Sequence, residues 1–247
     1  MDALLNYYDS ERLKYRNYLR LASKQPTPEV VHELRLTIKK IRALYYLAEF
    51  EHQSFDRTKQ FAFYRSIFRK AGKVRDLDII IELIENHNGN RRLDLRSLLP
   101  FLRAKRQQEM VQLRSYSNPS NDQTDSVIRR IIAKEISKND LEDFLDRIRN
   151  KLRSTQKKHL SQKRLHKMRK LYKMFGYIID ASKINWNHKS LKRLRKRQQV
   201  LGQWHDFSRA VTILTELDGS SEIRKIFRKQ EQQYRQKAIK QARKSVL

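Results

Sequence analysis

The chain has 247 residues, of which 38% are hydrophobic and 34% are charged, and it contains no cysteine. This composition is typical of a globular protein, and it excludes disulfides, thiolate nucleophiles and zinc–thiolate sites. With 56 Lys and Arg against 27 Asp and Glu, the formal net charge is +29, far more than solubility requires, so we expect an anionic partner.

Helical periodicity runs along nearly the whole chain, and only 5 Gly and 4 Pro are available to form turns. Thr27 is expected to cap a helix whose first residue is Pro28. Pro100 lies inside another expected helix, which we therefore expect to be kinked or to begin later. We predict helices over residues 2–23, 28–52, 55–87, 91–116, 124–137, 140–157, 160–182, 188–218 and 220–245.

Turn-forming residues interrupt this pattern at Asn88-Gly89-Asn90 and at Gly219-Ser220-Ser221. A longer stretch rich in Ser, Asn and Pro, over residues 115–123, is the one convincing linker. It divides the chain almost in half, and most of the positive charge lies in the second half. No run of 18 apolar residues occurs and the N-terminal residues lack the pattern of a secretory signal, so we expect a cytoplasmic protein without a membrane segment.

Two motifs occur once in each half, in the same order. The first, His-x-x-Arg-x-x-x-Lys, begins at His32 and again at His166. The second, Gly-x-x-(Arg/His)-Asp, begins at Gly72 and again at Gly202. Because order and spacing repeat together, we interpret the chain as a duplicated helical unit.

Both His motifs are amphipathic when they are placed on a helix. His32, Arg35, Lys39 and Arg42 fall within roughly 80° of the helix surface, and apolar residues fall on the opposite side. The same holds for His166, Arg169 and Lys173. Such a row of cations advances about 15 Å in ten residues, which suits an extended chain of negative charges. A basic helix face is often merely solvated, but its repetition at matched positions favours binding.

The glycine motifs are interpreted differently. Asp76 and Asp206 are expected to orient or neutralise neighbouring Arg and His side chains. Gly72 and Gly202 cost about 1 kcal/mol each within a helix, so we expect them to permit a close helix crossing or to keep a groove open. The aromatic residues at helical spacings are expected to pack in the core.

At these motifs the chain resembles the CHAD family, the conserved histidine alpha-helical domain. The first half carries its signatures as His32, Arg35, Lys39, Lys40 and Arg42, followed by Gly72, Arg75, Asp76 and Asp78. The second half carries His166, Arg169, Lys170, Lys173 and Tyr177, followed by Gly202, His205 and Asp206. It departs from the first where Gly176 stands for Arg42 and His205 stands for Arg75.

The resemblance implies an all-α fold of two four-helix-bundle-like halves, related by an internal pseudo-two-fold duplication around a basic central groove or pore. It implies one CHAD domain over residues 1–247, with repeat 1 over about 1–117, a linker at about 118–124 and repeat 2 over about 125–247. The ligand implied is inorganic polyphosphate, and we expect a stand-alone binding module that could associate with polyphosphate granules.

The expected ligand-binding residues combine both motif rows with basic residues of the helices that follow them. They are His32, Arg35, Lys39, Lys40, Arg42, Arg65, Arg69, Lys73, Arg75, His166, Arg169, Lys170, Lys173, Tyr177, Arg193, Arg195, Lys196, Arg197 and His205.

The main alternative is an RNA- or DNA-binding helical protein, because net charge does not distinguish phosphate chains with bases from those without them. An enzyme is not expected: His32-Glu33 does not continue into His-Glu-x-x-His, since Leu occupies position 36, and no Gly-rich phosphate loop occurs. We therefore expect no catalytic residue, metal or cofactor.

Overall fold

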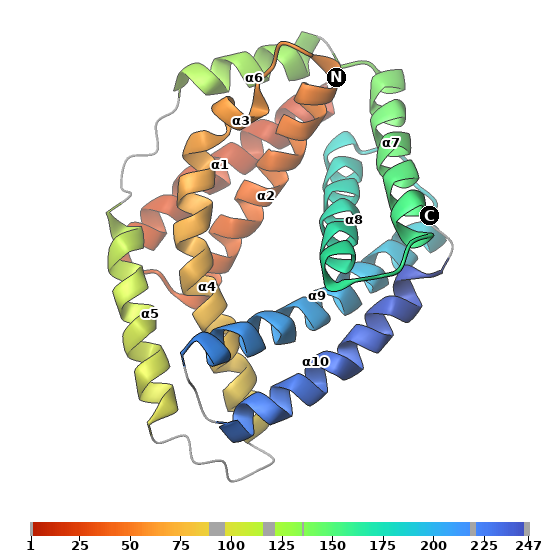
Figure 1. The fold of residues 1–247 in the computed structure, drawn as a ribbon. Coiled ribbons are helices and arrows are strands. Elements are labelled where there is room, and N and C mark those ends of the chain that lie inside the picture. Colours follow the sequence, from red (N-terminus) through yellow and green to blue (C-terminus); the bar gives the residue numbers. More distant parts are fainter. Residues whose placement is uncertain (1, 89–96, 116–121, 135, 218–220, 245–247) are drawn as a thin grey trace. The chain divides into compact units, whose positions relative to one another are not determined.

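The computed structural model describes residues 2–88, 97–115, 122–134, 136–217 and 221–244, and all the regular structure in these ranges is helical. The helices are shown in Figure 1. They are α1 (Asp2–Lys24), α2 (Pro28–Glu51), α3 (Arg57–Gln60), α4 (Ala62–Asn88), α5 (Leu98–Arg114), α6 (Asp122–Lys134), α7 (Lys138–Gln156), α8 (Gln162–Ser182), α9 (His188–Glu216) and α10 (Ser221–Ala242).

Local sequence signals set most of the helix ends. The Thr27 side chain accepts a hydrogen bond from the backbone N–H of Val30, and Pro28 is the first residue of α2, as predicted. Pro100 lies in the first turn of α5, where its missing N–H removes no intrahelical bond, so α5 begins at Leu98.

Two predicted boundaries differ from the structure. The helix predicted over 55–87 is divided at Phe61, because Asp56 caps a separate short helix by accepting from the Lys59 amide at 3.0 Å. The predicted linker is shorter at its end, since α6 begins at Asp122. Other predicted features lie wholly or partly outside the described residues. They are the breaks at residues 88–90 and 219–221 and the linker over 116–121.

The chain forms two compact units, and each combines segments from both sequence halves. Unit 1 contains Met1–Lys73, Glu109–Asn150 and Met174–Trp186. Unit 2 contains Val74–Gln108, Lys151–Lys173 and Asn187–Leu247. The linker is therefore not a boundary between compact units, and the internal duplication stays a prediction.

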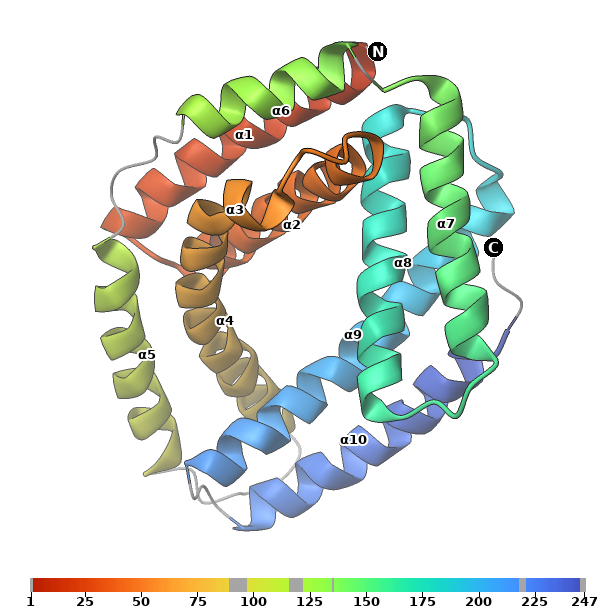
Figure 2. The same ribbon diagram turned by 45° about the horizontal axis from the view of Figure 1, so that its top comes forward.

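An aromatic cluster around one buried carboxylate forms the centre of unit 1. Asp125 of α6, only 4% exposed, accepts hydrogen bonds from the hydroxyls of Tyr8 (2.6 Å) and Tyr64 (3.3 Å) and pairs with Arg12. Tyr45 packs edge-on against Tyr64 with ring centroids 6.0 Å apart. These contacts attach α6 to α1, and the two helices run side by side in Figure 2.

The core of unit 2 is apolar and lies between α9, α10 and the parts of α4 and α5 that belong to this unit. Ile80, Leu102, Ala210 and Leu214 are fully buried in it. α9 and α10 form an antiparallel pair (Figure 2), joined by stacking of Phe207 on the ring of Tyr234 at 5.2 Å. Trp204 also donates to Glu231 at 2.8 Å. The pairing fixes the face of α9 that carries His205.

The described helices include none that combines the length and the apolar character needed to span a membrane.

Replacing Asp125 with Ala should reduce the free energy of unfolding by about 3–5 kcal/mol, because Arg12 and two tyrosine hydroxyls would lose their buried partner. Chemical denaturation measures this change. The matched control is Arg129→Ala, which removes the more exposed pair with Asp9 and should cost less than about 1 kcal/mol. Equal effects of the two substitutions would contradict the role given to Asp125.

Candidate anion-binding site

The predicted row on α2 lies opposite a buried apolar face. Leu34, Ile38 and Ile41 are 0% exposed and form part of the core of unit 1. His32 is exposed, and Arg35, Lys39 and Arg42 are partly buried. The amphipathic arrangement predicted from the sequence is therefore confirmed for α2.

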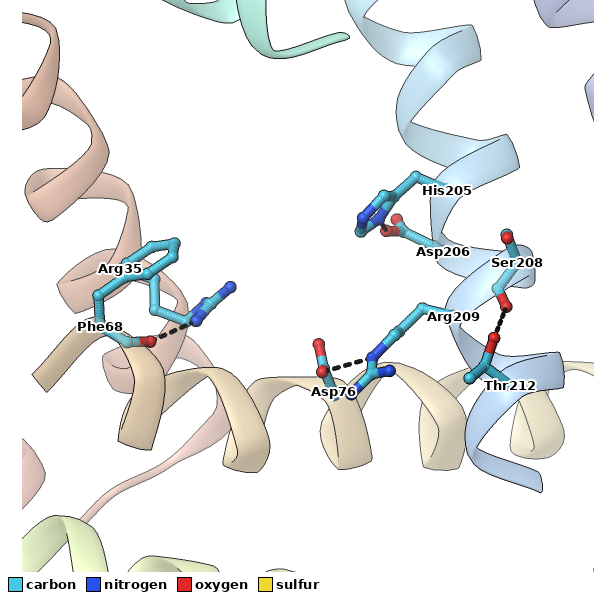
Figure 3. A network of polar contacts seen from close by, with 8 residues as sticks. All are labelled: Arg35, Phe68, Asp76, His205, Asp206, Ser208, Arg209 and Thr212. Carbon is cyan, nitrogen blue, oxygen red and sulfur yellow. Dashed lines mark hydrogen bonds and ion pairs between the residues drawn. The ribbon is translucent and has the colours of Figure 1, made fainter. Parts of the chain in front are cut away.

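Two arginines of this row lie over one aromatic ring of α4. The guanidinium carbon of Arg35 is 4.2 Å from the centroid of Phe68, and that of Arg42 is 5.2 Å from it. Arg35 also donates to the backbone carbonyl of Phe68 at 2.8 Å (Figure 3). Cation–π contacts and this hydrogen bond hold the two like charges on the same side of unit 1.

Gly72 provides the space for the Arg35 guanidinium. A Cβ atom at position 72 would lie 2.6 Å from Nη1 of Arg35, closer than van der Waals contact allows. At Gly202 a Cβ atom would meet nothing within 4 Å. The two glycines therefore differ: Gly72 permits a close approach of an arginine side chain, and Gly202 has no such steric role.

Tyr177 of α8 belongs to the same unit and interacts electrostatically with Arg42. Burial lowers the pKa of Arg42, and the neighbouring Tyr46 and Tyr177 oppose this shift. Arg42 nevertheless stays charged near neutral pH, because an arginine starts from a very high pKa. Tyr177 therefore adds a partly buried phenol beside the cations of α2.

The second row is centred on two histidines in unit 2. The rings of His166 on α8 and His205 on α9 stack with centroids 5.2 Å apart and planes 23° from parallel. Arg169 and Lys170 follow His166 at helical spacing, and both act on it electrostatically. The predicted apolar face opposite is confirmed, with Met168 and Phe175 fully buried.

Both histidines are neutral in the free protein near neutral pH. Burial, reinforced by Lys170, His205 and Arg169, lowers the pKa of His166 from 6.5 to about 4. Burial also lowers the pKa of His205, and its hydrogen bond to Asp206 opposes this shift. Protonating both stacked rings beside these cations is energetically costly unless an anion binds nearby.

The two aspartates of the glycine motifs act as partners of basic residues, as predicted. Asp76 accepts from Nε of Arg209 at 2.8 Å, and Asp206 lies 3.3 Å from Nδ1 of His205 (Figure 3). The third motif aspartate, Asp78, is 5% exposed and pairs with Arg106. Asp76 and Asp78 thus hold side chains of α9 and α5 against α4 within unit 2, and Asp206 contacts its neighbour on α9.

Several predicted binding residues have carboxylate or carbonyl partners in the structure. Lys40 pairs at 3.0 Å with Glu11, which is only 1% exposed, so its position serves the packing of α1 on α2. Lys73 pairs with Glu109 at 3.3 Å, and Arg75 lies 3.8 Å from Glu82. Arg65 donates to the carbonyl of Thr58 at 3.0 Å.

The basic residues predicted on α9 separate into two groups. Arg193, Arg195 and Lys196 are exposed, as is Arg69 on α4. Arg197 is only 2% exposed, and its guanidinium lies 5.6 Å from the ring centroid of Tyr172. A ligand in solution could not contact Arg197 without rearrangement of this part of unit 2.

Two further residues belong to the site and were not predicted from the sequence. Phe68, assigned to the core, holds the arginine pair; it precedes Gly72 by four residues and so shares its helix face. Arg209 follows His205 by four residues and binds Asp76. In both cases the signal in the sequence was a spacing of four residues from a motif residue, which places both residues on one helix face.

The described residues contain no group of three or more His, Asp or Glu side chains arranged to hold a metal ion.

Comparison with known families gives a match to the CHAD domain over residues 11–215. The chain belongs to the CHAD domain family. No curated protein matches the chain in sequence. The resemblance inferred from the four motifs is thereby confirmed, and the CHAD match includes both His rows and both glycine motifs.

Solved structures show the same fold at low sequence identity. The crystal structure of the CHAD domain from the plant Ricinus communis matches with a TM-score of 0.74 and 15% identity, over 100% of this chain and 92% of that one. PptA from Streptomyces chartreusis matches with a TM-score of 0.57 and 14% identity, over 98% of each chain. The all-α CHAD fold is therefore established, and convergence of the two rows on one groove stays a prediction.

The different roles of the two glycines can be tested with alanine substitutions. Gly202→Ala should raise the free energy of unfolding by about 1 kcal/mol, because alanine favours the helix and its methyl group meets nothing. Gly72→Ala should show no such gain and should be about 1–3 kcal/mol less stable than Gly202→Ala, because it displaces Arg35 from Phe68. Chemical denaturation compares them, and equal stabilisation by both would contradict this interpretation.

Proposed function

We propose that this CHAD domain binds inorganic polyphosphate through the cation rows of α2 and α8. The observation that carries the proposal is that each unit holds basic side chains close together beside aromatic or imidazole rings. In unit 1 two arginines share the ring of Phe68. In unit 2 two histidines stack beside Arg169 and Lys170. Family membership supports polyphosphate as the anion, as the motif resemblance implied.

The arrangement in unit 1 suits phosphate oxygens. Arg35 is held by a carbonyl and a ring, which limits its rotamers before any ligand arrives. Less side-chain entropy is then lost on binding, where about 0.5–1.5 kcal/mol is typical for each immobilised side chain. Planar guanidinium groups form paired, charge-assisted hydrogen bonds with phosphate, so this unit provides a prepared anion site.

The arrangement in unit 2 adds a proton-linked contribution. A phosphate chain beside His166 would oppose the cations that depress its pKa, and would raise that pKa from about 4. A group whose pKa is higher in the complex takes up a proton on binding. Affinity is therefore expected to increase as pH falls from the pKa of the complex toward about 4, and to level off below it.

We propose binding without catalysis. Phosphoryl transfer depends on bound metal ions held by carboxylates beside the phosphates. Two carboxylates of unit 2 that belong to a glycine motif instead pair with arginines: Asp76 binds Arg209 and Asp78 binds Arg106. The rows therefore provide binding groups, and we assign no residue to proton transfer or nucleophilic attack.

Titration with polyphosphate of defined length at several salt concentrations tests the proposal. Replacing Arg35, Arg169 and Lys170 with Gln should weaken binding at least tenfold and flatten the dependence of log K on log salt, because about one counterion is released for each phosphate contact. The affinity of the native chain should fall steeply as salt is raised.

The matched control replaces three exposed lysines outside the rows, Lys24, Lys183 and Lys189, with Gln, and removes the same charge. It should change affinity less than threefold, and circular dichroism should show both triple variants folded. Equal weakening by the two triple variants, or an affinity independent of salt, would contradict specific binding by the rows.

A further inference from the structure

The outer face of α10 is a second basic surface, on a helix that carries neither His row. The helix lies wholly beyond the residues that match the CHAD domain, which end at 215. It packs on α9 through buried residues such as Ile223 and Phe227. Its opposite side is exposed, as the burial pattern of residues 225–244 shows.

The exposed cations of α10 gather at its two ends. Toward the N-terminal end lie Lys225, Arg228 and Lys229. Toward the C-terminal end lie Lys237, Lys240 and Arg243, the last of them directly after the helix ends at Ala242, and these three border a surface hollow. The helix contains only two acidic residues: Glu222 lies in its first turn, and Glu231 accepts from Trp204. Exposed cations therefore outnumber exposed acidic residues on this face.

Glutamines occupy the space between the two cation groups. Gln232, Gln233 and Gln236 are all exposed on this face. Lys229 and Lys237 are eight residues apart, which corresponds to about 12 Å along a helix. The nearest members of the two cation groups are therefore about 12 Å apart along the helix, with neutral amide donors and acceptors between them.

We propose that the outer face of α10 binds double-stranded DNA across the major groove. The major groove of B-form DNA is about 12 Å wide and is bordered by two rows of phosphates, with base edges between them. The two cation groups would contact the phosphates, and the glutamine amides would face the base edges, where Gln pairs well with adenine. A flexible phosphate chain would gain nothing from the neutral centre of this face.

Other polyanions fit the same face less well. Insertion into an anionic membrane requires apolar side chains on the exposed face, whereas here that face carries Lys, Arg and Gln. Single-stranded nucleic acid binds through stacking on aromatic rings, but Tyr234 already stacks on Phe207 at 5.2 Å. The deep, narrow major groove of double-stranded RNA does not admit such a helix.

The test is a salt titration of the full chain with a 20-base-pair DNA duplex. Replacing Lys229, Lys240 and Arg243 with Gln should weaken duplex binding at least tenfold and reduce the slope of log K against log salt by about 2–3. The control with Lys24, Lys183 and Lys189 replaced by Gln should change it less than threefold. Equal weakening by the two variants would overturn the proposal.

A second variant tests the role of the glutamines without changing charge. Replacing Gln232, Gln233 and Gln236 with Ala should weaken duplex binding several-fold and leave the salt slope unchanged, because no phosphate contact is lost. Alanine favours helix, so loss of folding is not expected. Unchanged affinity, or equal affinity of the native chain for single-stranded DNA of the same length, would overturn the groove assignment.

The two sets of variants distinguish a failure of this proposal from a failure of polyphosphate binding by the rows. The variant with Arg35, Arg169 and Lys170 replaced by Gln should keep duplex binding within threefold of the native chain. The α10 variant should likewise keep its affinity for short polyphosphate. Loss of duplex binding in the row variant alone would show that DNA binds the rows, and would overturn the assignment to α10.

Discussion

The fold of this protein must accommodate the mutual repulsion of its many basic side chains, and the rest of the structure depends on how it does so. A net charge of +29 in 247 residues opposes compaction, so the fold must stabilise its cations locally. Part of the charge is neutralised inside the units, as where Lys40 reaches the buried Glu11 and Arg209 binds Asp76. At the two His rows the cations are supported differently: two arginines lie over one aromatic ring, and two histidines stay uncharged.

This division explains why the same motif residues have different roles. At Gly72 the Arg35 guanidinium occupies the space that a Cβ atom would need, whereas its counterpart Gly202 borders open space. The Asp residues of the motifs anchor basic side chains to α4 and α9 and so determine which face of each helix carries cations. Burial makes protonation of these histidines costly, and a bound anion would lower that cost. Anion binding and the stability of unit 2 are therefore coupled.

Helix positions followed from local sequence signals, but the partners of the cations did not. Apolar periodicity and caps such as Thr27 located the long helices closely, and the four motifs identified the family. Pairs such as Lys40–Glu11, Lys73–Glu109 and Asp76–Arg209 join residues 29 to 133 positions apart, and helical periodicity carries no information about such distances. For the same reason the burial of Arg197 against Tyr172 was not foreseen.

The most direct test of this account is proton uptake when polyphosphate binds. Calorimetric titrations at pH 6 in two buffers of different ionisation enthalpy measure it, and the account predicts uptake by the native chain because His166 begins neutral, with a pKa of about 4. The His166→Gln variant should bind with clearly smaller uptake. Binding heats that are identical in the two buffers, or the absence of any binding heat, would contradict the central claim that an anion is required to charge this cluster.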